Sequence, residues 1–279
     1  MKRTTVIIAG LDVHIYTTKT FATSTKPILA LFALHGRLES SETGSIQNLI
    51  PPLVDAAEKH ESEKGKDLMV IALDHRNHGT RLRDNTANLD FKENANHLHD
   101  MWTIQAGTAQ DVSFLMDYLE AYLFPAGERS IVEWGVAGIS LGGHAAWILA
   151  AAEPRVTLAI PIIGCPDYLK LMVPRAAASG IAMRPPHFPE SLVKVIRAKG
   201  PPALPYTSKG HENPFLGKKI LVLSGEADTL VPWTASQVFV EGLEVGPTGV
   251  KEYILFHGVG HAVPPPMVNA AVNFVLGVL

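Results

Sequence analysis

Short apolar runs alternate with segments of helical periodicity along most of this 279-residue chain. Runs that are almost continuously apolar are typical of strands covered on both faces of a sheet. Strands that alternate with helices indicate an α/β fold, with a mostly parallel central sheet of about eight strands flanked by helices. The apolar runs occupy residues 28–34, 68–73, 131–137, 158–163, 220–223 and 253–256.

The first residues and the polar stretches complete this pattern. Two β-branched runs, residues 5–9 and 13–16, flank Gly10 and predict an opening hairpin. A turn is predicted at residues 61–66 and a loop at residues 97–100. Helices are predicted at residues 53–60, 104–124 and 144–152, and after the last strand. Within 104–124, one helical face carries Val112, Leu115, Met116, Leu119 and Leu123.

One segment interrupts the alternation. About fifty residues separate Gly164 from Gly217, where a short connection would suffice, and prolines are frequent among them. Helices are predicted within this segment at residues 168–178 and 191–199. The segment is therefore expected either to form a structure of its own or to be a crossover helix with long arms.

Composition narrows the classes of protein. Hydrophobic residues make up 47% of the chain, enough for a large single core, and the net charge of −3 gives no reason to expect nucleic acid as a partner. No apolar run approaches the length of a membrane span, and the apolar stretch near the N-terminus is too short for a signal-peptide core. The single cysteine, Cys165, excludes an internal disulfide. These features predict a soluble, cytoplasmic protein; a homodimer stays open.

The motif Gly138-x-Ser140-x-Gly142 is the strongest chemical signal in the chain. An apolar strand precedes it and a helical pattern follows it, which is the context that places a serine on a sharp strand-to-helix turn. Glycines on both sides are needed because side chains would clash across so tight a turn. Ser140 is therefore the candidate nucleophile.

An acid and a histidine follow later in the chain, each after an apolar strand. Asp228 lies in the turn after residues 220–223, and His261 lies in the loop after residues 253–256. The order serine, aspartate, histidine resembles that of the α/β-hydrolase superfamily, in its serine esterase and lipase branch. Carboxyl ends of parallel strands share one edge of a sheet, so the three side chains are expected to meet there.

The resemblance implies a role for each residue. Ser140 is the nucleophile, His261 the general base and Asp228 the acid that orients it, with His257 and Glu226 as the rival base and acid. The family pattern Gly-x-Gly-His favours His261, and the pattern Asp-x-x-Val-Pro favours Asp228. An alternative is that Asp228 merely caps the helix that follows.

The resemblance also implies an oxyanion hole made of two backbone N–H groups. One belongs to Leu141, and the other to Arg37 in the segment after residues 28–34; Leu38 is the alternative donor. The segment Asp74-x-Arg76-x-His78 resembles a structural turn of the family, with Asn77 where a glycine is usual. Cys165 is expected to be a small buried side chain.

The proline-rich segment falls where α/β-hydrolases commonly carry a cap over the active site. The resemblance therefore implies a hydrolase core at residues 1–164 and 216–279, with a small helical cap at residues 165–215. Tyr168, Leu171 and Met172 are expected to wall the substrate pocket.

The predicted function is hydrolysis of a carboxylic ester, lactone or thioester of a small organic substrate through an acyl-enzyme on Ser140. No cofactor is expected, and no metal, because His97 and His99 fit no strong zinc pattern. Two alternatives stay open. The same triad serves lyase, isomerase or cyclase chemistry, or the chain is a binding protein without turnover.

Overall fold

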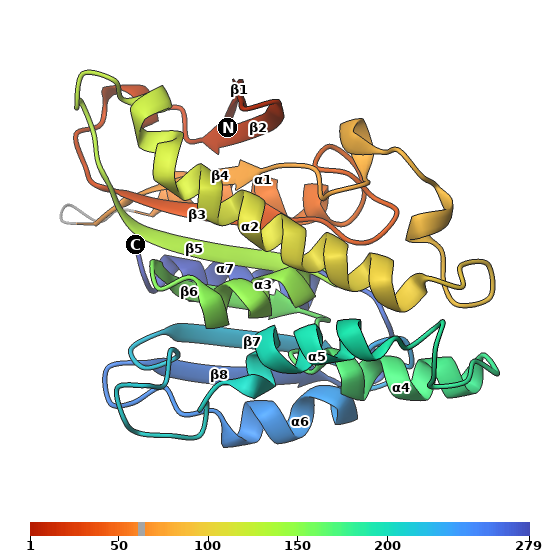
Figure 1. The fold of residues 1–279 in the computed structure, drawn as a ribbon. Helices are drawn as coiled ribbons and strands as arrows, with labels where there is room; N and C mark the ends of the chain where they lie inside the picture. Colours follow the sequence, from red (N-terminus) through yellow and green to blue (C-terminus); the bar gives the residue numbers. More distant parts are fainter. Residues whose placement is uncertain (61–64) are drawn as a thin grey trace.

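Eight strands form a single sheet in the computed structural model, which describes residues 1–60 and 65–279 (Figure 1). Their order in the sheet is β1-β2-β4-β3-β5-β6-β7-β8. The strands are β1 (Lys2–Ile8), β2 (Leu11–Thr17), β3 (Ile28–Leu34), β4 (Asp67–Ala72), β5 (Ile131–Ile139), β6 (Val156–Ile162), β7 (Lys219–Gly225) and β8 (Val250–Phe256).

Only the first two strands depart from the parallel arrangement. β1 and β2 form an antiparallel hairpin, and β2 pairs with β4 in the antiparallel sense. From β4 to β8, every neighbouring pair in the sheet is parallel. The predictions of an opening hairpin and a mostly parallel sheet of about eight strands are confirmed. The turn predicted at residues 61–66 lies largely outside the described residues.

Helices cover both faces of the sheet and bury a separate core on each. One face packs mainly against α2 and α3, and the other against α1 and α7 (Figure 1). Because helices cover both faces, β3 is buried along its whole length, and all of its residues are apolar. The helices are α1 (Ile46–Lys59), α2 (His97–Leu123), α3 (Leu141–Ala152), α4 (Tyr168–Ala178), α5 (Glu190–Lys199), α6 (Trp233–Gly242) and α7 (Pro265–Leu276).

Two helices begin seven residues earlier than the sequence pattern predicts. α1 begins at Ile46 and continues through Pro51 and Pro52. Its buried stripe of Ile46, Leu49, Ile50, Leu53 and Val54 stabilises the helix in spite of the prolines, which usually break one.

The second helix is α2. It begins at His97, so the loop predicted at residues 97–100 is wrong. His97 and Leu98 are buried there and extend the apolar face of the helix by two turns toward its N-terminus. The polar histidines concealed this continuation of the pattern.

Residues 165–215 contain α4, α5 and the short helix η4 (Pro201–Ala203), and both predicted helices are present. α4 connects two distant parts of the chain. The Tyr168 hydroxyl donates to the carbonyl of Leu98 at the start of α2, over 2.8 Å, and Arg175 donates to the carbonyl of Leu230 in the loop after β7. Within the described residues, no helix is both long and apolar enough to cross a membrane.

Candidate active site

Ser140 lies at the turn between β5 and α3 in a strained backbone conformation. Its φ of 53° and ψ of −107° are rare for a residue with a side chain. A Cβ on Gly138 would lie 2.1 Å from the carbonyl oxygen of Gly142, and a Cβ on Gly142 would lie 2.3 Å from that of Leu34. Both glycines of the motif are therefore required by the close approach of backbone to backbone.

A chain of hydrogen bonds joins Ser140, His261 and Asp228. Ser140 Oγ lies 2.9 Å from His261 Nε2, and His261 Nδ1 lies 2.7 Å from Asp228 Oδ2. An ionised carboxylate only accepts, so His261 donates from Nδ1 and its Nε2 is left to accept the serine proton. The structure thus brings together the three residues that the sequence singled out, although they come from three separate loops.

Asp228 is fixed by a second set of contacts. Its Oδ1 accepts from the backbone N–H groups of Leu230 (2.8 Å) and Val231 (2.9 Å). Burial alone would raise the pKa of Asp228, but hydrogen bonds from His261, Val231 and Leu230 outweigh it and hold the pKa below its usual value. The carboxylate is charged at neutral pH and shapes its own loop while it orients His261.

The rival acid and base pair with each other at the surface. His257 Nδ1 lies 2.6 Å from Glu226 Oε2, and their side chains are 96% and 55% exposed. The corresponding values for His261 and Asp228 are 22% and 0%. Ser140 is hydrogen-bonded to His261, not to His257.

Leu141 follows Ser140 in the chain, and Arg37 lines the same cavity as the serine. Leu141 is the first residue of α3, where backbone N–H groups have no partner within the helix. The next N–H, that of Gly142, is already bound to the carbonyl of His35 over 3.1 Å. Among residues 1–60 and 65–279, neither Leu141 nor Arg37 has an acceptor for its backbone N–H, and the same holds for Leu38.

Glu39 holds the loop that carries Arg37. Its carboxylate accepts from the N–H of Gly36 (3.0 Å), the N–H of Ser45 (3.0 Å) and the hydroxyl of Ser45 (2.9 Å). Leu38 adopts the left-handed region with φ 65°, which turns the chain back sharply. The position of the Arg37 N–H therefore depends on a network of side chains rather than on a regular element.

Two buried histidines join this loop to the next one. The backbone N–H of His75 donates to His35 Nε2 over 3.0 Å, and His75 Nε2 donates to the carbonyl of His35 over 2.9 Å. Burial lowers the pKa of His35 to about 4, with only partial compensation by its bond to Gly36. Both rings are thus neutral at physiological pH and act as scaffold.

The turn after β4 is also structural. Asp74 accepts from the N–H and hydroxyl groups of both Ser41 and Thr80, at 2.7 to 2.9 Å. Burial would raise the pKa of Asp74, but these bonds outweigh it and lower the pKa. Asn77 has a φ of 59°, a region that suits glycine best and asparagine next. That conformation explains why asparagine is accepted where the family pattern has glycine.

Cys165 lies against His144 on α3 and is 3% exposed. Its backbone N–H donates to His144 Nδ1 over 2.8 Å. Burial raises the pKa of the Cys165 thiol to about 12, so no thiolate forms near neutral pH. Burial also lowers the pKa of His144 to about 4.

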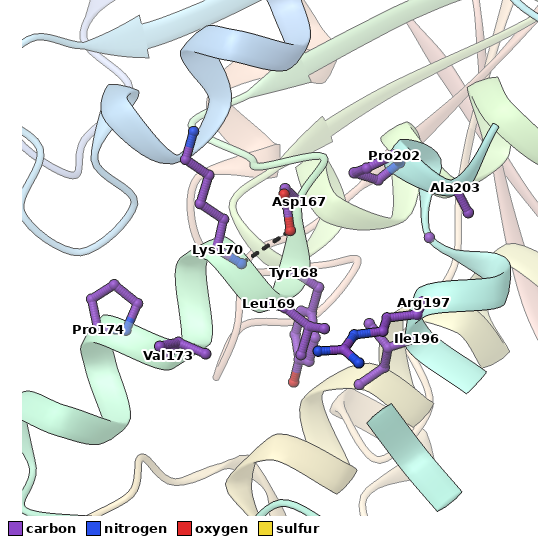
Figure 2. A pocket seen from close by; sticks show the side chains of 11 residues that line it. Asp167, Tyr168, Leu169, Lys170, Val173, Pro174, Ile196, Arg197, Pro202 and Ala203 are labelled. Atoms are coloured by element: carbon purple, nitrogen blue, oxygen red, sulfur yellow. Dashed lines mark hydrogen bonds between the residues drawn. The ribbon is translucent and has the colours of Figure 1, made fainter. Parts of the chain in front are cut away.

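Ser140 opens into a small cavity of about 190 Å³. Arg37, Leu38, His261 and Leu230 are among the residues that line it. None of the three side chains expected to wall the pocket lines this cavity. Tyr168 lines a separate cavity of about 560 Å³ between α4 and α5, shown in Figure 2.

The other two expected side chains lie elsewhere on α4. Leu171 borders a third cavity, which extends toward the loop after β7, and Met172 is buried in the core. Leu230 lines this third cavity as well as the one at Ser140. Residues of α4 and Ser140 thus line neighbouring cavities that share Leu230. The role of residues 165–215 as a cap stays a prediction.

The candidate site residues from the sequence did not include His97 or Arg175, whose guanidinium is hydrogen-bonded to Leu230 in the wall of this cavity. Arg175 follows Leu171 by four residues and Met172 by three, so it shares the buried stripe of α4. A charged residue on an apolar stripe was the available signal. His97 had no such signal, because the helix that buries it was predicted to begin later.

Solved structures similar to this chain have the α/β-hydrolase fold. The protein TT1662 from Thermus thermophilus matches with a TM-score of 0.70 and 20% identity, over 99% of this chain and 97% of that one. Est1E from Butyrivibrio proteoclasticus, solved with ferulic acid, matches with a TM-score of 0.60 and 17% identity, over 99% and 98%.

A cold-adapted esterase from an Arctic intertidal metagenomic library is also similar, with a TM-score of 0.59 and 17% identity, over 99% of this chain and 93% of that one. The sequence matches no protein-family model and no curated protein. The chain therefore has the α/β-hydrolase fold, as the order of its motifs implied.

Proposed function

We propose that this protein is a serine hydrolase that cleaves a carboxylic ester, lactone or thioester of a small organic substrate. One observation carries the proposal. Ser140 is strained at the tip of its turn and hydrogen-bonded over 2.9 Å to His261, which in turn is bonded over 2.7 Å to a buried aspartate. A serine hydroxyl is a weak nucleophile unless a base of this kind adjoins it.

The geometry defines the steps. His261 Nε2 takes the proton as Ser140 Oγ attacks the carbonyl carbon, and Asp228 stabilises the imidazolium. The N–H groups of Leu141 and Arg37 donate to the oxyanion, each contributing about 3 kcal/mol to the transition state. His261 then protonates the leaving group. Water, activated by the same histidine, hydrolyses the acyl-enzyme on Ser140 and restores the serine.

Similar structures support an ester as the substrate. Esterases from an Arctic metagenomic library and from Pyrococcus furiosus share the fold at 17% and 18% identity. Residues 165–215 act as the cap in this proposal, because α4 contacts the loop of Asp228 through Arg175 and Leu230. A covered site excludes water from the acyl-transfer step.

Turnover of p-nitrophenyl butyrate tests the proposal. Wild-type protein should release p-nitrophenol catalytically, and Ser140→Ala should lose the activity while its melting temperature stays close to that of the wild type. Cys165→Ala is the matched control and should keep the activity, because its thiol is protonated and buried. Equal activity of Ser140→Ala and wild type would overturn the proposal. Non-hydrolytic chemistry predicts no release from any simple ester.

A further inference from the structure

One arginine lines the cavity at Ser140, and a second is hydrogen-bonded to Leu230 in the wall of that cavity. Arg37 lines the cavity itself, and its Nη1 donates to the carbonyl of Asn88 over 2.9 Å. Asn88 is held in turn by Asn77, since its side-chain amide donates to the Asn77 carbonyl over 2.7 Å and its Oδ1 accepts from the Asn77 amide over 3.0 Å. The guanidinium of Arg37 is therefore anchored by backbone and amides, not by a carboxylate.

Arg175 approaches from α4. Its Nη2 donates to the carbonyl of Leu230, which also lines the cavity, and its Nη1 lies 4.0 Å from the sulfur of Met172. Its Nε is buried and has no partner among the described residues. Arg175 itself lines the third cavity, which shares Leu230 with the cavity at Ser140, and part of its hydrogen-bonding capacity is unused.

Neither guanidinium forms an ion pair within residues 1–60 and 65–279. By contrast Arg76, Arg129 and Arg155 each contact a carboxylate at 2.6 to 2.8 Å. A half-buried cation without a counter-ion is costly.

The pKa of each arginine is lowered, as expected for cations without a paired carboxylate. Burial lowers the pKa of Arg175, and Arg37 lowers it further, whereas Tyr168, Cys165 and Asp228 raise it only in part. Burial also lowers the pKa of Arg37, against the opposing effect of Asp90 and Glu93. Positive charge therefore accumulates beside the nucleophile.

His97 adds a third polar group. Its Nδ1 donates to the carbonyl of Leu89 over 2.6 Å, which leaves Nε2 buried and without a partner among the described residues. Burial lowers the pKa of His97 to about 4, and both Arg37 and Arg175 lower it further against the bond to Leu89. Because both arginines lower the pKa of His97, its ring lies in the same region of the molecule as they do.

We propose that the substrate is an anionic ester, whose carboxylate or phosphate is bound by Arg37 and Arg175 while its ester carbonyl lies at Ser140. Guanidinium groups match the geometry of both oxyanions and bind them through two parallel hydrogen bonds. Arg37 lines the same small cavity as Ser140, and Arg175 lines the cavity that shares Leu230 with it, so the anion is expected a short chain away from the ester. This inference rests on the proposed function, since it assigns the substrate class of the same site.

Matched esters provide the kinetic test. Monomethyl succinate and methyl succinamate differ in the charge of the acyl part. The esters 3-acetoxypropanoate and 3-acetoxypropanamide differ in the charge of the alcohol part. A third substrate, 2-acetoxyethyl phosphate, distinguishes phosphate from carboxylate. The wild type should show a kcat/KM at least about tenfold higher for the anionic member of one pair than for its neutral member, or for 2-acetoxyethyl phosphate than for 3-acetoxypropanamide. Arg175→Gln should remove most of that preference, and Arg37→Gln should do the same.

Arg197→Gln is the matched control, because Arg197 is exposed on α5 and lines the neighbouring cavity of Figure 2 instead. It should leave the preference unchanged. Equal kcat/KM within every pair, or a preference that survives both arginine substitutions, would overturn the inference.

A binding measurement separates this inference from the proposed function. Succinate or inorganic phosphate should raise the melting temperature of the wild type but not that of Arg175→Gln, and succinamide should have no effect on either. This result stands even if no ester is turned over, in which case the hydrolase proposal fails and anion binding survives. Hydrolysis of neutral esters without any shift by succinate or phosphate would show the reverse.

Discussion

Two histidine–carboxylate pairs lie on the same two loops of this protein, and only one of them is hydrogen-bonded to Ser140. Glu226 and Asp228 follow β7, and His257 and His261 follow β8. Both pairs are hydrogen-bonded at nearly the same distance, 2.6 Å for the first pair and 2.7 Å for the second. The bond itself therefore does not distinguish the pair beside Ser140 from the pair at the surface.

Burial and the neighbours of each pair make the difference. Asp228 is shielded from solvent and receives two backbone N–H bonds besides the histidine, while Glu226 and His257 face water. Of these two histidines, His261 alone has a hydroxyl of the described residues within hydrogen-bonding distance, that of Ser140. An ion pair in water is screened and loses orientation, whereas a buried one keeps a single geometry. The comparison predicts large effects for one pair and small effects for the other.

Removal of the base is expected to have the largest effect. His261→Ala should lower kcat on the order of 10⁶-fold, because Ser140 loses its proton acceptor. His257→Ala should keep the kcat of the wild type. Steady-state hydrolysis of p-nitrophenyl butyrate measures both variants. A large loss in His257→Ala would mean that the exposed pair is the catalytic one.

Removal of the negative charge on the acid is expected to have the second largest effect on kcat. Asp228→Asn should lower kcat on the order of 10⁴-fold, because the amide favours the wrong tautomer of His261. Glu226→Gln should change kcat by less than about twofold, as expected for an exposed ion pair. Similar losses in the two variants would show that burial does not decide between the two acids.

The backbone around each pair differs as well. A Cβ on Gly138, beside Ser140, would lie 2.1 Å from a backbone oxygen, whereas a Cβ on Gly258, in the loop of His257, would meet nothing within 4 Å. Gly138→Ala should reduce the free energy of unfolding by about 3 kcal/mol or more. Gly258→Ala should cost about 1 kcal/mol, because its φ of 69° strains a side chain. Urea denaturation compares them, and equal losses would refute this account of the turn.

The site also predicts how stability depends on pH. His144, next to the triad, is neutral when folded, with its pKa lowered by burial to about 4 from an unfolded value of about 6.5. Its contribution to stability is complete above pH 6.5 and is lost as the pH falls toward 4, since only the unfolded chain takes up the proton. The loss is about 2 kcal/mol at pH 5.

Urea denaturation at pH 7.5 and pH 5.0 checks this expectation. The free energy of unfolding of the wild type should fall between the two values, and His144→Gln should show a smaller fall. A fall of the same size in both proteins would contradict the neutral state of the ring.

Local patterns were enough to predict the fold and the three residues of the hydrogen-bonded chain. The strand before Ser140, its two glycines and the loops of Asp228 and His261 are each encoded within about ten residues. Sequence alone separated Asp228 from Glu226 by a family pattern, and the structure supplies the physical reason, which is burial.

Contacts between distant segments could not be predicted from local sequence patterns. The anchoring of Arg37 depends on Asn77 and Asn88, and the position of Arg175 depends on how α4 packs against the loop of Leu230. The start of α2 was missed because buried His97 resembles a polar loop residue in the sequence. Tyr168, Leu171 and Met172 do not line the cavity at Ser140, and α4 is linked to the wall of that cavity by the hydrogen bond from Arg175 to Leu230.

Covalent labelling tests the central claim most directly, because it needs no knowledge of the substrate. A fluorophosphonate probe reacts with a serine that has both a paired base and an oxyanion hole. We expect peptide mapping to find the adduct on Ser140 alone, with labelling lost in His261→Ala and retained in His257→Ala. An adduct on another serine, or no adduct on folded wild-type protein, would contradict the assignment of Ser140, His261 and Asp228 as the catalytic group.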